Sequence, residues 1–362
     1  MAGRSDHTRL TLGLGIFGYV PAPEVVRIVR LADELGVRNA WIGDSQVLWR
    51  EAYSVLGACA VQTERIVLGP GVSNVTTRHV SVIASALLTL FELSEGRVAA
   101  GLGTGDSSMR TLGRKPVSRE VLADRIGTLR ALLAGAEARE TLDDSQDGHS
   151  YTLAYGADDA GPASIPIYVA AGTPRSLELA GRIADGVILC VGSTPDSIET
   201  AIDHVQAGAE AAGRSLDDIH RVLWTPISVN EDAKAARDAV RVYVAGNVNI
   251  HAPSTNRLTE DEKAAIAAVR DQYHYRNHMS VAAGHAASVP DSLVAKVAIA
   301  GTVEDCRQRV REIAGTRVQQ IGGVPAGATA EDRPRVIEEF TRHVFDAVVP
   351  ELEGAISRQA EG

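Results

Sequence analysis

The alternation of short apolar strands with amphipathic helices is the sequence feature that most constrains this fold. Residues 11–18 are a strand-like apolar run, and residues 24–36 place apolar side chains at helical spacing before a glycine. The pair recurs along the chain, and eight strands that alternate with helices predict an α/β fold, a (β/α)8 TIM barrel with insertion segments. The predicted strands are 11–18, 39–44, 65–73, 97–105, 165–173, 185–190, 221–229 and 318–325.

Two stretches interrupt this alternation. The first, near residues 140–165, is polar, and the second, at about 232–296, has helical patterns and no clear strand. We expect the second to be a helical insertion large enough to cover a pocket. Because barrels often exceed the usual domain size, residues 1–362 are predicted to form a single domain.

The composition narrows the function class. Hydrophobic residues make up 45% of the chain, charged residues 23%, and the net charge is −10. An acidic chain of this kind is not expected to bind nucleic acid or an anionic membrane. No apolar run approaches the roughly 20 residues of a membrane span, and the N-terminus lacks the apolar core of a signal peptide, so we expect a cytoplasmic protein.

No metal site is predicted. The three cysteines are far apart and form no C-x-x-C pair. His274 and His278 are four residues apart on an expected helix, but no H-E-x-x-H motif accompanies them. A place in a substrate lid or on a solvated helix face suits them better.

Glycines and short polar residues end several predicted strands. Active sites of TIM barrels lie at the C-terminal strand ends, and bare backbone there suits a planar ligand that main chain approaches closely. The polar ends lie at Gly43, Asp44 and Ser45, at Gly69–His79, at Gly103, Thr104, Gly105 and Asp106, and at Ala170, Ala171, Gly172 and Thr173.

A dinucleotide-binding fold is the main alternative. Residues 13–18 match G-x-G-x-x-G, and Asp44 ends the second predicted strand. The last glycine of that motif should lie in the first turn of a helix, yet Pro21 and Pro23 follow and the helix cannot begin before them. The barrel is therefore the better interpretation.

Three long segments resemble the luciferase-like flavin and deazaflavin oxidoreductases, and within them the methylenetetrahydromethanopterin reductase type. The segments are GPGVSNVTTRHVSVIASALLTLFELSEGR, GLGTGDS and VAAGTPRSLELAGRIADGVI. The resemblance implies a barrel, a homodimer, a site for coenzyme F420 or alternatively FMN, and a non-prolyl cis peptide at Gly71-Val72 behind the cofactor ring. The cofactor-binding residues that it implies are Asp44, Gly71, Val72, Ser73, Asn74, Gly103, Thr104, Gly105, Ala170, Ala171, Gly172 and Thr173.

The same resemblance suggests the catalytic residues. Asp106 lies where related sugar-phosphate dehydrogenases have a proton-donating glutamate, and Trp49 matches an active-site tryptophan. Ser45 replaces their catalytic histidine, which disfavours alcohol oxidation. His79 is a further candidate for a bond to the ring or to a phosphate. Each acid and His79 also has a structural alternative, since such residues often cap turns and helices.

Three functional hypotheses follow. The first is an F420-dependent or flavin-dependent oxidoreductase that transfers hydride to or from a small organic substrate, most simply as a reductase. The second is a monooxygenase that uses reduced FMN and oxygen. The third is a non-catalytic flavin-binding barrel, which would need a pocket too closed or too bare for a substrate. The long insertion with Tyr275, His278 and His285 argues against it.

Overall fold

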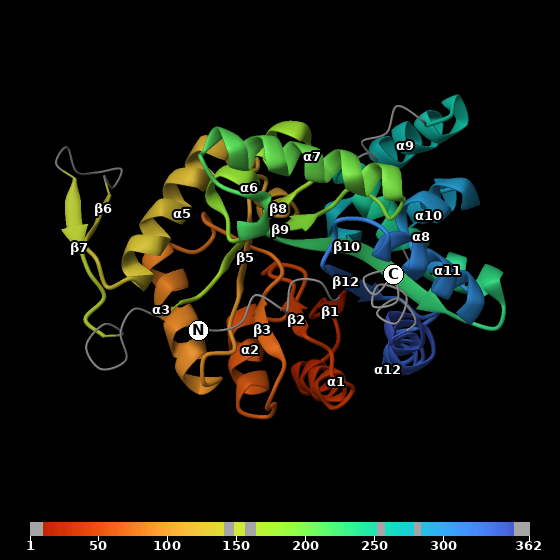
Figure 1. Cartoon of the computed structure of the whole chain (residues 1–362), viewed down its shortest axis with the longest axis horizontal. Coiled ribbons are helices and arrows are strands. Elements are labelled where there is room, and N and C mark those ends of the chain that lie inside the picture. Colours follow the sequence, from red (N-terminus) through yellow and green to blue (C-terminus); the bar gives the residue numbers. More distant parts are fainter. Residues whose placement is uncertain (1–9, 141–147, 156–163, 252–257, 279–283, 351–362) are drawn as a thin grey trace, which may run out of the picture.

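The computed structural model describes residues 10–140, 148–155, 164–251, 258–278 and 284–350 (Figure 1). Within these residues, parallel strands follow one another around a barrel in chain order. The predicted (β/α)8 TIM barrel is therefore confirmed. Its strands are β1 (Thr11–Ile16), β2 (Asn39–Ile42), β3 (Val67–Pro70) with β4 (Ser73–Asn74), β5 (Ala100–Gly103), β8 (Ile167–Ala171), β9 (Gly186–Leu189), β10 (His220–Val229) and β12 (Gln320–Pro325).

The third position of the barrel is a divided strand. β3 pairs with β2, while β4 pairs with β5, so the two pieces join different neighbours. Between the pieces lies Gly71-Val72, whose peptide bond is cis as predicted. An isolated β-bridge between Leu68 and Val98 brings β3 beside the start of β5. The first barrel strand in the chain, β1, pairs with the last, β12.

Helices cover the outside of the barrel (Figure 1). The longer helices bury apolar side chains: Val25, Ile28 and Val29 of the first helix are almost fully buried, which is the consequence of their helical spacing. The helices are α1 (Ala22–Glu34), α2 (Ala52–Ala60), α3 (Val80–Leu93), α4 (Ser107–Arg110), α5 (Arg119–Leu133), α6 (Pro174–Ile183), α7 (Pro195–Ala211), α11 (Val303–Ala314) and α12 (Arg333–Glu339), which continues as a π-helix over Phe340–Phe345.

Two excursions leave this pattern. A short antiparallel pair, β6 (Ala138–Glu140) and β7 (His149–Tyr151), stands away from the barrel (Figure 1). The second excursion follows β10 and ends in β11 (Ile299–Gly301), which pairs with the end of β10. It contains α8 (Ala233–Ile250), α9 (Glu260–Gln272), the 3-10 turns η2 (Tyr275–Asn277) and η3 (Gly284–Ser288), and α10 (Asp291–Val297).

The helix expected to carry His274 and His278 ends before both of them. α9 ends at Gln272 because Tyr273 takes an extended conformation with ψ 117°. The Tyr273 ring then packs edge-on against Tyr275, with ring centroids 5.2 Å apart. His274 and His278 therefore do not share one helix face.

The second excursion and the barrel share an apolar cluster. Val240 and Val244 of α8 and Leu293 of α10 pack in one group with two barrel residues. These are Phe17, which follows β1, and Val324, which lies in β12. This packing fixes α8 over the C-terminal strand ends. Among the helices that the structure describes, none combines the length and apolar character that crossing a membrane requires.

Candidate active site

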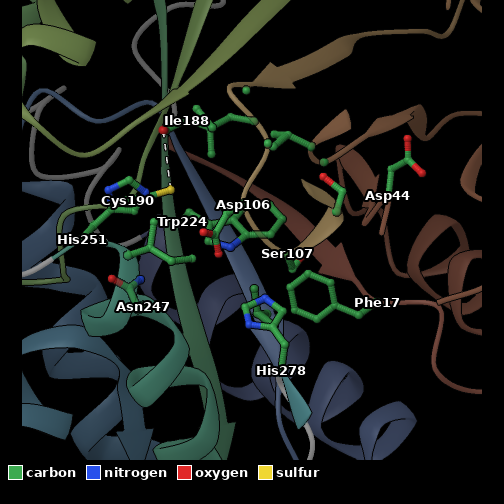
Figure 2. Close-up of a pocket in the computed structure, with 18 of the residues that line it drawn as sticks. Phe17, Asp44, Asp106, Ser107, Ile188, Cys190, Trp224, Asn247, His251 and His278 are labelled. Carbon is green, nitrogen blue, oxygen red and sulfur yellow. Dashed lines mark hydrogen bonds between the residues drawn. The ribbon is translucent and has the colours of Figure 1, made fainter. Parts of the chain in front are cut away.

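A pocket opens where the strands end and α8 covers them (Figure 2). Its empty volume, including the open mouth, is about 1100 Å³. One part of its wall comes from β3, β4, β5 and β8 and consists of bare backbone and small side chains. We call this part the small-residue half, formed by Gly71, Val72, Ser73, Gly103 and Ala170.

Another part of the wall, the aromatic half, consists of Phe17, Trp49, Trp224 and Tyr243. Phe17 stacks on Trp49 with ring centroids 4.6 Å apart and on Tyr243 at 6.3 Å. The Trp224 ring meets Phe17 edge-on at 6.5 Å. These rings come from the residue after β1, from the middle of β10, from the segment after β2 and from α8.

Asp44 lies after β2 and is only 4% exposed. Ser73 Oγ donates a hydrogen bond of 2.6 Å to Asp44 Oδ2, and Arg78 Nε lies 3.4 Å from the same oxygen. Arg78 also pairs with Glu51 and stacks over the Tyr53 ring at 4.9 Å. The carboxylate at the end of β2 is thus held by a buried hydroxyl and a fixed guanidinium.

Asp106 follows β5 through Gly105, whose φ of +81° favours glycine. Its Oδ1 accepts hydrogen bonds from Arg110 Nε at 2.8 Å and from Tyr275 Oη at 3.0 Å. Its Oδ2 is buried and has no hydrogen-bond partner in the described part of the chain. Burial raises the pKa of Asp106, and the contacts with Arg110 and Tyr275, which lower it, do not cancel that effect.

Asp106 does not cap α4, although it precedes that helix: its side chain makes no capping hydrogen bond. The carboxyl is instead turned toward the pocket, where Figure 2 places it between Trp224 and Ser107. A buried acid with a raised pKa at the wall of a pocket is a candidate proton donor.

His251 ends α8 and lies against the backbone of Gly172. A Cβ atom on Gly172 would approach His251 Cγ to 2.6 Å, so only glycine leaves room for the ring. Burial lowers the pKa of His251 to about 4, and the imidazole is therefore neutral at physiological pH. Nearby Cys190 also lines the pocket, and burial raises the pKa of its thiol to about 12.

Most predicted site residues line this pocket, whereas others lie outside its lining. Those in the lining are Asp44, Trp49, Gly71, Val72, Ser73, Gly103, Thr104, Gly105, Asp106 and Ala170. Ala171, Gly172 and Thr173 lie outside the lining: Thr173 N binds Ser176 Oγ at the start of α6.

Three further predicted residues make contacts of a structural kind. Ser45 is buried and its Oγ lies 3.0 Å from Ser107 Oγ. Asn74 accepts hydrogen bonds from the backbone N–H groups of Thr76 and Thr77, which shapes the turn after β4. His79 is exposed and caps α3, the structural alternative considered for it.

Several lining residues were not predicted from the sequence. Phe17 follows a strand whose glycines indicate a role of the backbone and not of the side chains. Tyr243 and Asn247 lie in α8 and His251 follows it; no motif marks them, although helical spacing from Tyr243 to Asn247 puts both on one face. Ile188 looks like an ordinary core residue of β9 and shares the lining with them.

A parallel barrel with its pocket at the C-terminal strand ends, bounded by bare backbone and by a buried acid, defines a ligand-binding barrel of enzyme type. The chain belongs to the luciferase-like monooxygenase family, whose model matches residues 6–320. This result confirms the family predicted from the sequence.

Relatives within the family have reductase and dehydrogenase names. A 5,10-methylenetetrahydromethanopterin reductase of Methanolobus tindarius is 31% identical over 91% of this chain and 98% of its own length. An F420-dependent glucose-6-phosphate dehydrogenase of Mycolicibacterium fortuitum is 32% identical over 76% of this chain and 83% of its own.

Solved structures have the same fold. The coenzyme F420-dependent tetrahydromethanopterin reductase from Methanopyrus kandleri superposes with a TM-score of 0.73 at 24% identity, over 94% of this chain and 99% of that chain. An F420-dependent secondary alcohol dehydrogenase also reaches 0.73, at 16% identity, over 94% of this chain and 99% of its own.

Proposed function

We propose that this protein is an oxidoreductase that transfers a hydride between coenzyme F420 and a small organic substrate, acting as a reductase. The main support is the buried carboxyl of Asp106 at the edge of a bare-backbone slot. The names of the relatives agree with this cofactor.

The small-residue half fits a flat cofactor ring. A Cβ atom on Gly103 would stand 3.3 Å from Val72 and 3.9 Å from Ala170, so any larger residue would fill the slot. The cofactor, when bound there, supplies the hydride chemistry, which protein side chains lack. In the proposed site, Gly71, Val72 and Gly103 support the ring face.

Asp44 and Asp106 have different roles in the proposed site. Asp44, held by Ser73 and Arg78, orients a hydrogen-bond donor of the cofactor. Asp106, whose pKa burial raises, holds a proton and gives it to the substrate as the hydride arrives. Ser45 has no adjacent base, which disfavours removal of a proton from an alcohol.

The competing candidate is a monooxygenase that uses reduced FMN and oxygen. It is favoured by one observation, the name of the matched family. An equilibrium titration with both cofactors decides between them, with cofactor emission as the signal. We expect F420 to bind more tightly. FMN binding that is at least tenfold tighter, about 1.4 kcal/mol, would favour the monooxygenase.

The assembly and location of the protein are further parts of the proposal. The chain acts as a homodimer in the cytoplasm and takes a small-molecule substrate, as the family resemblance implies. Light scattering on the purified protein measures the mass of the assembly directly. A monomer at micromolar concentration would contradict the dimer.

A further inference from the structure

The aromatic half is the part of the pocket that the proposed cofactor slot leaves for a substrate. Phe17 is inclined by 26° to Trp49 and by only 13° to Tyr243, so three rings face in similar directions. Phe17 and Tyr243 are almost fully buried, whereas Trp49 and Trp224 are partly exposed, so the two indoles offer the accessible surface of this wall. Flat aromatic faces of this kind bind planar, unsaturated partners by offset stacking.

The charges around the pocket are unsuited to an anion. Its acidic side chains are Asp44 and Asp106, its imidazoles are His251 and His278, and none of the described lining residues is lysine or arginine. Burial lowers the pKa of His251 to about 4, so its ring does not supply a positive charge either. An anion would enter near Asp44 without meeting a lysine or an arginine of the described lining.

The two arginines nearest to these acids already have partners. Arg78 binds Asp44 and Glu51, and Arg110 binds Asp106. A carboxylate or phosphate that entered the aromatic half would lose its water and meet no lysine or arginine side chain in the described lining. Such a loss is costly in a partly buried site.

We propose that the substrate is an uncharged, planar molecule with a carbon–carbon double bond conjugated to a carbonyl, bound with its ring against the aromatic half. This inference rests on the proposed function. Asn247 places an amide in the same pocket, close to His251 in Figure 2, and can donate a hydrogen bond to the carbonyl oxygen.

The reaction balances without another reactant. One alkene carbon gains the hydride from reduced F420, and its neighbour gains the proton of Asp106 with the former π-electron pair. The double bond becomes a single bond, the cofactor leaves oxidised, and Asp106 takes a new proton from water. The class excludes hexose phosphates, which need a cation for the phosphate.

A matched pair of probes tests this substrate class. Coumarin is planar, uncharged and conjugated, and coumarin carboxylate adds one negative charge to the same ring. Equilibrium dialysis measures both affinities, with oxidised F420 bound and without it. We expect coumarin to bind at least about tenfold more tightly, which corresponds to about 1.4 kcal/mol. Equal or tighter binding of the carboxylate, or of neither probe, would overturn the proposal.

Variants of the aromatic half test the stacking separately from the charge preference. Trp224→Leu should weaken coumarin binding by about three- to tenfold, the usual value of one aromatic contact. Trp49→Leu serves the same purpose if the first variant does not fold. The control is Tyr155→Leu, which removes an aromatic ring that is 44% exposed and outside the pocket. Unchanged coumarin binding by the folded wall variants would contradict the proposal.

Adding a cation should reverse the preference. Asn247→Lys places an ammonium group in the pocket, and we expect it to raise the affinity for coumarin carboxylate while coumarin gains nothing. If carboxylate binding stays unchanged in this variant, the charge argument is wrong. The dialysis without F420 keeps the two proposals distinguishable. If the protein does not bind F420 but still prefers coumarin to coumarin carboxylate, only the proposed cofactor is contradicted.

Discussion

At the scale of single residues, Asp106 combines an ion pair with a raised pKa. An adjacent guanidinium normally lowers the pKa of a carboxyl, and Arg110 Nε is only 2.8 Å away. Burial has the larger effect here because Oδ2 makes no hydrogen bond within the described chain. An acid of this kind is poised to donate a proton.

Replacing Asp106 by Asn removes that proton and keeps the shape. We expect turnover with reduced F420 to fall by about 10²–10⁴, the usual contribution of general acid catalysis. Binding of F420 should change little, since Asp106 is assigned to the substrate side. Stopped-flow oxidation of the cofactor measures the first quantity and a titration the second. Full turnover in Asp106→Asn would exclude Asp106 as the proton donor.

The pH dependence of turnover follows from the same carboxyl. Because burial raises the folded-state pKa of Asp106, the proton is retained to a higher pH than in an unfolded chain. Reduction needs this protonated form, so the rate should be constant at low pH and fall as the pH rises through that pKa. The residual rate of Asp106→Asn should lack this fall, which a pH series for both proteins measures.

At the scale of elements, the excursion between β10 and β11 touches the proposed acid through Tyr275 of η2. Asn249 Nδ2 donates 3.0 Å to Tyr275 Oη, which in turn donates to Asp106 Oδ1. Burial raises the pKa of Tyr275 to about 12, so its hydroxyl stays protonated and remains a donor. The covering segment therefore bears directly on the proton supply.

Tyr275→Phe should raise the pKa of Asp106 further, since the lost hydrogen bond stabilises the carboxylate. The groups near this carboxyl are Arg110, Tyr273 and Tyr275, and His278 packs on Tyr275. A carbon-13 NMR titration of the Asp106 carboxyl gives the shift, which we expect to be about one pH unit.

The assignment and controls for that titration come from the same chain. Asp106→Asn identifies the signal by removing it, and Tyr155→Phe is a tyrosine control that should leave the midpoint unchanged because Tyr155 binds Ser85 on the surface. Asn249→Ala should give a smaller rise in the same direction. If the midpoint in a folded Tyr275→Phe protein stays or falls, the tyrosine only packs there.

At the scale of the whole molecule, the barrel and the excursion have a common core. Phe17 and Val324 of the barrel pack with Val240 and Leu293, so neither part can separate without exposing apolar surface. We propose on this basis that residues 1–362 form a single domain. Urea unfolding followed by circular dichroism and by methyl NMR of Leu293 should then give one common midpoint; two separate midpoints would show independent units.

The barrel strands were predictable because each is a short apolar run with a polar end, and the residues of the small-residue half follow from those ends. The rest depends on how distant segments meet. Nothing in the sequence brings Tyr275 to Asp106, or His251 to Gly172, because those contacts arise only when α8 and η2 fold back over the strand ends. His79 shows the opposite case, where a polar residue at a strand end proved to be a helix cap.

The tryptophans of this chain are built-in optical reporters of the site. The sequence has three, and all lie at the pocket: Trp49 and Trp224 in its aromatic half, and Trp41 behind Gly71, where a Cβ atom would come within 2.4 Å of its side chain. The excitation energy of an indole so close to a conjugated ring is passed to that ring by energy transfer. Ultraviolet excitation of the unlabelled protein should therefore reveal each arrival and departure of a chromophoric ligand.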